Sequence, residues 1–173
     1  MYSGNAYKSF PWLYDLLYQR YLKSVPDFVA LVAKHTPKGG TILDIAAGTG
    51  EVTIPLLQKG FSVASLDVNK GMLKELQIKA KKRGIKNYHV VICDMKNVGF
   101  KEKFDSVCIR QAINYFKGVK ALEVGLKNIR ASLKEGGIFI FNAPRYQGQK
   151  QYPVIANRYE RNGQNAFVLE TNT

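Results

Sequence analysis

Residues 41–51 read Thr-Ile-Leu-Asp-Ile-Ala-Ala-Gly-Thr-Gly-Glu, and this stretch decides the fold. Its first five residues are mostly apolar and have the length of one buried strand. Gly48 and Gly50 follow, and because glycine has no Cβ, a ligand can approach the backbone there closely. A strand that ends in a glycine turn and leads into a helix is typical of nucleotide-binding α/β folds. The stretch therefore predicts a ligand site at the carboxyl end of a first strand.

Strands and helices alternate on the carboxyl side of this turn. Further strands are predicted at 61–66, 88–93, 104–109 and 138–143, and helices at 51–59, 70–83 and 118–133, with a turn at Gly136-Gly137. Apolar strands separated mostly by helices build a parallel sheet that helices cover on both faces. We therefore predict a doubly wound α/β fold whose ligand lies at the switch point beside the first strand.

The segments on either side of this core have different patterns. Residues 1–40 predict an N-terminal helical cap, with one helix opening at Pro11 and a second one over 24–35. Residues 144–173 predict a loop and then a β-hairpin around Asn162-Gly163, a dipeptide typical of hairpin turns. We divide the chain accordingly into a cap (1–40), an α/β core (41–143) and a C-terminal segment (144–173).

The composition indicates a cytoplasmic protein without a membrane partner. The chain has 173 residues, of which 46% are hydrophobic, enough to bury a core. Its first residues lack the apolar run of a secretory signal, and the longest unbroken apolar run, 28–33, is too short to cross a bilayer. Cys93 and Cys108 fit reduced thiols better than a disulfide. Two Cys and two His at unrelated spacings predict no metal site.

The formal net charge of +13 is unevenly distributed. Between residues 68 and 103, ten Lys and Arg residues stand against three acidic ones. Such a cluster could bind the phosphates of a nucleic acid. However, Lys74, Lys81 and Lys82 fall away from the apolar stripe of their predicted helix, as a solvated face does. Because no RNA-binding module accompanies the charge, we favour the solvated face.

Acidic residues mark three successive strands around the glycine turn. Asp44 lies in the first strand, Asp67 ends the second and Asp94 follows the third. An acid before the glycines repels phosphate and attracts an ammonium group, whereas Asp67 can accept hydrogen bonds from both hydroxyls of a ribose. Asp94 can accept from an adenine amino group while Met95 packs on the ring. Each acid alone also fits a helix cap, but three around one turn favour a nucleoside that carries an amine.

With these motifs, residues 41–143 resemble the class I S-adenosylmethionine-dependent methyltransferases. The likeness rests on the segments 43–50, 63–73, 92–95, 104–107 and 133–140. The resemblance implies a Rossmann-like methyltransferase fold with S-adenosylmethionine as the cofactor. It implies contacts to the methionyl end from Asp44, the turn that contains Ala46, Gly48 and Gly50, and the backbone near Arg110; to the ribose from Asp67, with Val68 beside it; and to the adenine from Asp94 and Met95. Ala46 departs from the family, because many members have glycine there.

The segment after the fourth predicted strand should border the transferred methyl group. Gln111, Asn114 and Tyr115 follow that strand and could orient an amine or hydroxyl acceptor. No side chain stands out as a general base, and the signatures of nucleobase methyltransferases are missing. We therefore expect an enzyme that transfers a methyl group by in-line displacement to a small-molecule acceptor, preferably an amine.

Several alternatives remain open. A quinone-type C-methyltransferase shares the first motif, and an RNA methyltransferase would use the basic cluster. An NAD(P)-dependent oxidoreductase fits less well, because Thr53 stands where its fingerprint requires a third glycine. The family's sheet usually ends in a sixth strand and an antiparallel seventh. The predicted hairpin either replaces these strands or is an insertion in a truncated chain, as in glycine and amino-sugar N-methyltransferases. Missing strands would also fit a non-catalytic, S-adenosylmethionine-binding subunit.

Overall fold

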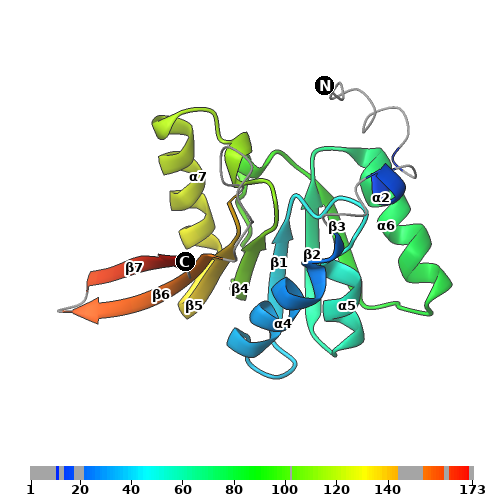
Figure 1. The fold of residues 1–173 in the computed structure, drawn as a ribbon, viewed down its shortest axis with the longest axis horizontal. Coiled ribbons are helices and arrows are strands. Elements are labelled where there is room, and N and C mark those ends of the chain that lie inside the picture. The colour runs from blue at the N-terminus through cyan, green and yellow to red at the C-terminus, as the bar shows by residue number, and fades with distance from the viewer. Residues whose placement is uncertain are drawn as a thin grey trace.

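The computed structural model describes residues 11, 14–17, 22–101, 103–143, 154–161 and 164–171. These residues form a seven-stranded sheet in the order β3-β2-β1-β4-β5-β6-β7 (Figure 1). The strands are β1 (Thr41–Ile45), β2 (Ser62–Asp67), β3 (Tyr88–Ile92), β4 (Phe104–Ile109), β5 (Leu133–Phe141), β6 (Val154–Arg161) and β7 (Gln164–Thr171). The helical elements are α2 (Tyr14–Leu17), α4 (Val25–His35), α5 (Thr53–Gln58), α6 (Lys70–Lys82) and α7 (Val119–Ser132), with the 3-10 turns η2 (Met95–Asn97) and η3 (Ile113–Tyr115).

Strands β1 to β5 are parallel to one another. The chain runs outward from β1 through β2 to β3 and then returns to β4 on the other side of β1. This reversal creates the predicted switch point, where the loops after β1 and β4 diverge to opposite faces of the sheet. The doubly wound parallel core is therefore confirmed. β6 pairs antiparallel with β5 through Phe141 and Val154, and β7 pairs antiparallel with β6.

Helices cover both faces of the parallel sheet because alternate strand residues point in opposite directions. On one face, buried Ile42, Val63 and Cys108 pack against α4 and α5. On the other face, buried Leu43 and Val107 belong to a cluster that includes α7. Figure 1 shows α7 across the sheet from α4 and α5. The core is thus two apolar layers, with strand residues buried on both faces.

The predicted turn at Gly136-Gly137 is wrong in one respect. β5 begins at Leu133, which pairs with Phe104, and Ile138 pairs with Ser106. Residues 134–137 therefore bulge out of a strand that continues on both sides of them. Gly136 has φ +77°, a conformation that glycine adopts without the steric cost of a Cβ. The local sequence shows the two glycines, but it does not show that β4 pairs with β5 on both sides of the bulge.

Polar side chains close the amino ends of the central strands. The Asp105 carboxylate accepts hydrogen bonds from the backbone N–H and the hydroxyl of Thr41, both at 2.8 Å. The Lys134 ammonium donates to both oxygens of the same carboxylate at 2.9 Å. The hydroxyls of Thr36 and Ser106 lie 2.8 Å apart in the buried layer beside them. These groups satisfy one another, so this end of the sheet carries a structural cluster.

Some predictions lie outside the described residues. These are the helical assignments for residues 1–10, 12–13 and 18–21, the loop at 144–153 and the Asn162-Gly163 turn. Cys93 and Cys108 are both free thiols. Within the described part of the chain, no helix is both long enough and apolar enough to cross a membrane.

Candidate functional site

A cavity of about 620 Å³ opens at the carboxyl ends of β1 to β4. This volume is in the range of sites for small molecules and cofactors. Its lining comes from the ends of the strands and the segments after them, from the start of α6 and from α2. The lining residues are Tyr14, Ala46, Gly48, Leu66, Asp67, Val68, Asn69, Lys70, Met72, Cys93, Asp94, Met95, Lys96, Arg110, Gln111, Ala112 and Tyr115. Of the site residues predicted from sequence, Asp44, Gly50 and Asn114 do not line the cavity.

The glycine turn after β1 presents its backbone to this cavity. Ala46 and Gly48 have φ values of +57° and +55°. A Cβ placed on Gly48 would meet no atom within 4 Å, so the space beside it is open to a ligand. A Cβ placed on Gly50 would lie 2.7 Å from Cγ of Leu76. Gly50 is therefore required for close packing of the turn against α6, whereas Gly48 gives access.

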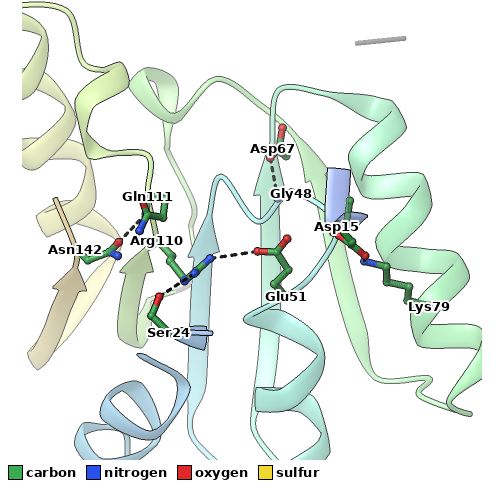
Figure 2. A network of polar contacts seen from close by, with 10 residues as sticks. Asp15, Ser24, Gly48, Glu51, Asp67, Lys79, Arg110, Gln111 and Asn142 are labelled. Carbon is green, nitrogen blue, oxygen red and sulfur yellow. Dashed lines mark hydrogen bonds and ion pairs between the residues drawn. The ribbon is translucent and has the colours of Figure 1, made fainter. Parts of the chain in front are cut away.

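Asp67 lies at the end of β2 and faces the turn. Its Oδ2 accepts a hydrogen bond from the Gly48 N–H at 2.9 Å (Figure 2). Its Oδ1 accepts from the Asn69 N–H at 2.8 Å. Burial raises the pKa of Asp67, and these hydrogen bonds oppose the rise. The N-cap of α6 is Asn69, whose side chain accepts from the Gly71 and Met72 N–H groups. Asp67 is thus not the cap of α6. The Val68 N–H also contributes a backbone hydrogen bond, and because a carboxylate has about four acceptor sites, Asp67 retains capacity to accept from a ligand hydroxyl.

Asp94 combines two roles at the end of β3. Its Oδ1 accepts from the Lys96 N–H at 2.9 Å and so caps η2. It also lines the cavity, together with Met95 and Cys93. The capping interpretation and the ligand interpretation are therefore compatible for this residue.

Asp44 lies beneath the turn, with its side chain in the layer between the sheet and α5. The residue is 1% exposed, and its Oδ2 accepts from the Thr53 hydroxyl at 2.6 Å. Cys108 Sγ lies 3.7 Å from its Oδ1. Burial raises the pKa of Asp44 to about 6, while the Thr53 hydrogen bond opposes the rise. Any action of Asp44 on a ligand in the cavity is therefore electrostatic, through the turn above it.

A buried ion pair at the wall of the cavity was not predicted from the sequence. Arg110 Nη1 lies 3.2 Å from Glu51 Oε2, and Arg110 Nη2 donates to the Ser24 hydroxyl at 3.1 Å (Figure 2). Burial raises the pKa of Glu51 to about 7, and the attraction of Arg110 opposes the rise. Burial likewise lowers the pKa of Arg110 against the pull of Glu51. Desolvation of both groups thus outweighs their attraction. The signal was an acid directly after the glycine turn and an arginine directly after β4.

The segment after β4 forms the opposite wall of the cavity. Gln111 and Tyr115 line it, whereas Asn114 is exposed on η3 and does not. Gln111 has φ +60°, and its backbone N–H donates to Asn142 Oδ1 at 2.6 Å. This wall is therefore held in place from the end of β5.

Helix α2 lies over the turn and closes one side of the site. The Thr49 hydroxyl donates to Asp15 Oδ1 at 2.6 Å. Asp15 also forms an ion pair with Lys79 of α6 (Figure 2). Tyr14 lines the cavity from the same helix. Within the described residues, no group of three or more His, Cys, Asp or Glu side chains could hold a metal ion.

A doubly wound sheet with an open glycine turn and acids after β2 and β3 defines the class I methyltransferase type of fold. Residues 42–137 match the family model for the methyltransferase domain, and the chain belongs to this family of class I S-adenosylmethionine-dependent methyltransferases.

Relatives and solved structures agree with this assignment. The chain is 28% identical to an S-adenosylmethionine-dependent methyltransferase from Clostridium acetobutylicum, whose structure superposes with a TM-score of 0.69 over 91% of this chain and 66% of that one. It is 30% identical to the PH0226 protein from Pyrococcus horikoshii, with a TM-score of 0.68 over 79% and 64%. It is 29% identical to the dTDP-3-amino-3,6-dideoxy-alpha-D-glucopyranose N,N-dimethyltransferase of Streptomyces fradiae, over 74% of this chain and 50% of that protein. The chain thus spans about half the length of the curated relatives it matches.

Proposed function

We propose that the protein binds S-adenosylmethionine in this cavity and transfers its methyl group to a small-molecule amine. The observation that carries the proposal is convergence: Asp67 and Asp94 face the same cavity as the open backbone at Gly48. In this arrangement the turn holds the methionyl end, Asp67 the ribose hydroxyls and Asp94 the adenine amino group. The buried Asp44 adds negative potential beneath the turn, which favours an ammonium group over a phosphate.

The rest of the cavity wall suits the same molecule. Val68 is 71% exposed although it is apolar, and it lines the cavity together with Met95. A flat aromatic base placed between such side chains would cover apolar surface that otherwise faces water. The apolar side chains of Val68 and Met95 therefore fit the adenine base, in addition to the acidic residues that fit the polar groups of an adenosine.

On the side of β4, the main role of the protein would be to orient the acceptor, because no side chain there is a clear general base. S-adenosylmethionine, when bound, would supply a methyl group whose bond to sulfur breaks as the acceptor lone pair bonds to the methyl carbon in line, with S-adenosylhomocysteine as the leaving group. Gln111 and Tyr115 would hold the acceptor nitrogen on that line, since much of the acceleration of such a reaction comes from orientation. Tyr14 and α2 would exclude water from the same side. An amine is the favoured acceptor, because the dTDP-amino-sugar relative methylates an amino group.

Two measurements test the proposal. Titration calorimetry should show binding of S-adenosylmethionine and S-adenosylhomocysteine, with no binding of NADH as the comparison. Transfer of labelled methyl groups is then measured with glycine, a dTDP-3-amino sugar, a quinol and tRNA. Label on either amine supports the proposal, and label on the quinol or tRNA alone refutes the acceptor class. Binding without any transfer would favour a non-catalytic subunit, and no cofactor binding would refute the proposal as a whole.

A further inference from the structure

Gln111 occupies a backbone conformation that residues with a Cβ rarely adopt. It lies just beyond the end of β4 with φ +60°, in the left-handed region. Ala46 and Gln111 are the only described non-glycine residues with positive φ, and both line the cavity. Such conformations persist only where neighbouring groups hold them, and they concentrate at functional sites.

Asn142 holds this conformation from the neighbouring strand. Ile109 and Phe141 are partners in the ladder between β4 and β5, so the residues that follow them leave the sheet side by side. Asn142 Oδ1 accepts from the Gln111 N–H at 2.6 Å (Figure 2). The Asn142 N–H donates to the Ile109 carbonyl at 3.3 Å. Asn142 is 6% exposed, so its side-chain amide is buried. Loss of this amide would leave the Gln111 N–H without its acceptor, and an unpaired buried N–H costs free energy.

The conformation of Gln111 decides where the chain goes next. Gln111 and Ala112 line the cavity in succession, and Tyr115 lines it from η3, with its N–H donating to the Ala112 carbonyl at 2.9 Å. A change of φ at Gln111 would therefore redirect this entire wall. Asp67 and Asp94 belong to β2 and to the segment after β3, and their hydrogen bonds do not involve the wall.

We propose that Asn142 is a positioning residue that fixes the acceptor-facing wall of the cavity through the backbone of Gln111. Asn142 does not line the cavity itself and acts only through the turn it holds. The inference rests on the proposed function, because that function places most cofactor contacts on the β1–β3 side and the acceptor beside Gln111 and Tyr115, with the backbone near Arg110 as the one cofactor contact expected from the β4 side.

The test distinguishes loss of the hydrogen bond to the Gln111 N–H from other effects of replacing Asn142. Asn142→Ala removes the acceptor, whereas Asn142→Asp keeps a side-chain oxygen in place. Gln111→Gly makes the left-handed conformation accessible without help, so Asn142→Ala is also made in that background. For each protein we would measure kcat and KM for glycine and a dTDP-3-amino sugar, the Kd for S-adenosylhomocysteine, and amide hydrogen exchange at position 111.

We expect Asn142→Ala to impair turnover of the acceptor while cofactor affinity stays nearly unchanged. Asn142→Ala should lower kcat/KM at least tenfold and speed amide exchange at position 111 at least tenfold, with the Kd for S-adenosylhomocysteine changed less than twofold. Asn142→Asp should stay within about threefold of wild type. In the Gln111→Gly background, Asn142→Ala should cost less than about threefold. An equal cost in both backgrounds, or a parallel loss of S-adenosylhomocysteine affinity, would overturn the inference.

Failure of the proposed function would show separately, as a wild-type protein that does not bind S-adenosylhomocysteine or does not methylate the amines. Hydrogen exchange needs neither cofactor nor acceptor and still reports the contact in that case. An exchange rate at position 111 that Asn142→Ala leaves unchanged overturns the inference whatever the activity.

Discussion

Replacing Glu51 by Gln should make the folded protein less sensitive to rising pH. The Glu51 side chain is 14% exposed, and burial raises its pKa from an ordinary 4.5 to about 7 although Arg110 lies 3.2 Å away. The folded state therefore binds this proton more tightly than the unfolded chain does. Stability from this proton is fully present below about pH 4.5 and is lost as the pH rises through 7. Glutamine has no proton to lose, so the variant lacks this dependence.

The size of the effect follows from the shift in pKa. Each unit corresponds to about 1.4 kcal/mol of differential stability between the two protonation states. Because the unfolded carboxyl is already partly ionised at pH 5, the loss between pH 5 and pH 8 is roughly 2–3 kcal/mol. With urea m-values of about 1–3 kcal/mol/M, the unfolding midpoint of the wild type should fall by on the order of 1 M more than that of the variant.

Urea unfolding followed by circular dichroism at pH 5, 6, 7 and 8 measures this difference. Groups that titrate in both proteins independently of Glu51 cancel when the two curves are subtracted. Glu123→Gln, on the exposed surface of α7, is the control for removing one negative charge.

A constant offset between wild type and Glu51→Gln at every pH would refute this reasoning. It would mean that Glu51 loses its proton equally easily in the folded and unfolded states. The offset itself would then measure only the loss of the ion pair with Arg110, for which truncation of one buried partner costs about 3–5 kcal/mol.

Three further predictions concern binding, packing and charge. Asp67→Ala should weaken S-adenosylmethionine binding by about 1–3 kcal/mol in calorimetry, because charge-assisted hydrogen bonds are lost, and unchanged affinity would reject its ribose assignment. Gly50→Ala should lower the free energy of unfolding by about 2–5 kcal/mol, because strain and a steric clash add, whereas Gly84→Ala, where space is open, should lower it by about 1–2 kcal/mol. Equal losses in urea unfolding would contradict the packing argument. Lys81→Glu combined with Lys82→Glu should leave methyl transfer to an amine within about twofold, and a loss confined to tRNA would indicate a nucleic-acid surface.

The order and type of the core elements could be predicted because each has a strong local signal. The bounds of β4 agree residue for residue with the strand predicted at 104–109, and α6 begins after Asn69, a good N-cap residue. The convergence of Asp67 and Asp94 was predictable for a different reason. Parallel strands end at one edge, so residues at their carboxyl ends must meet there.

The remaining features depend on contacts between distant parts of the chain. Glu51 and Arg110 are 59 residues apart, and the position of each one directly after a strand or turn does not identify the other as its partner. Gln111 and Asn142 are brought together only by the register of β4 on β5. For Asp44 a local rule was available: alternate residues share a face, so its carboxylate points with Ile42 toward α5, and the lining of the cavity leaves it out.

The cluster around Asp105 at the amino ends of the strands has a consequence for how this protein tolerates change. Its polar groups are hydrogen-bonded to one another, so substitutions there should lower the free energy of unfolding. At the opposite edge, the backbone of Gly48 and the carboxylate of Asp67 face the cavity, where a ligand can contact them. A library that randomises exposed positions after β4, such as Asn114 and Tyr115, and keeps Thr41, Asp105 and Lys134 should therefore change selectivity while the scaffold stays intact.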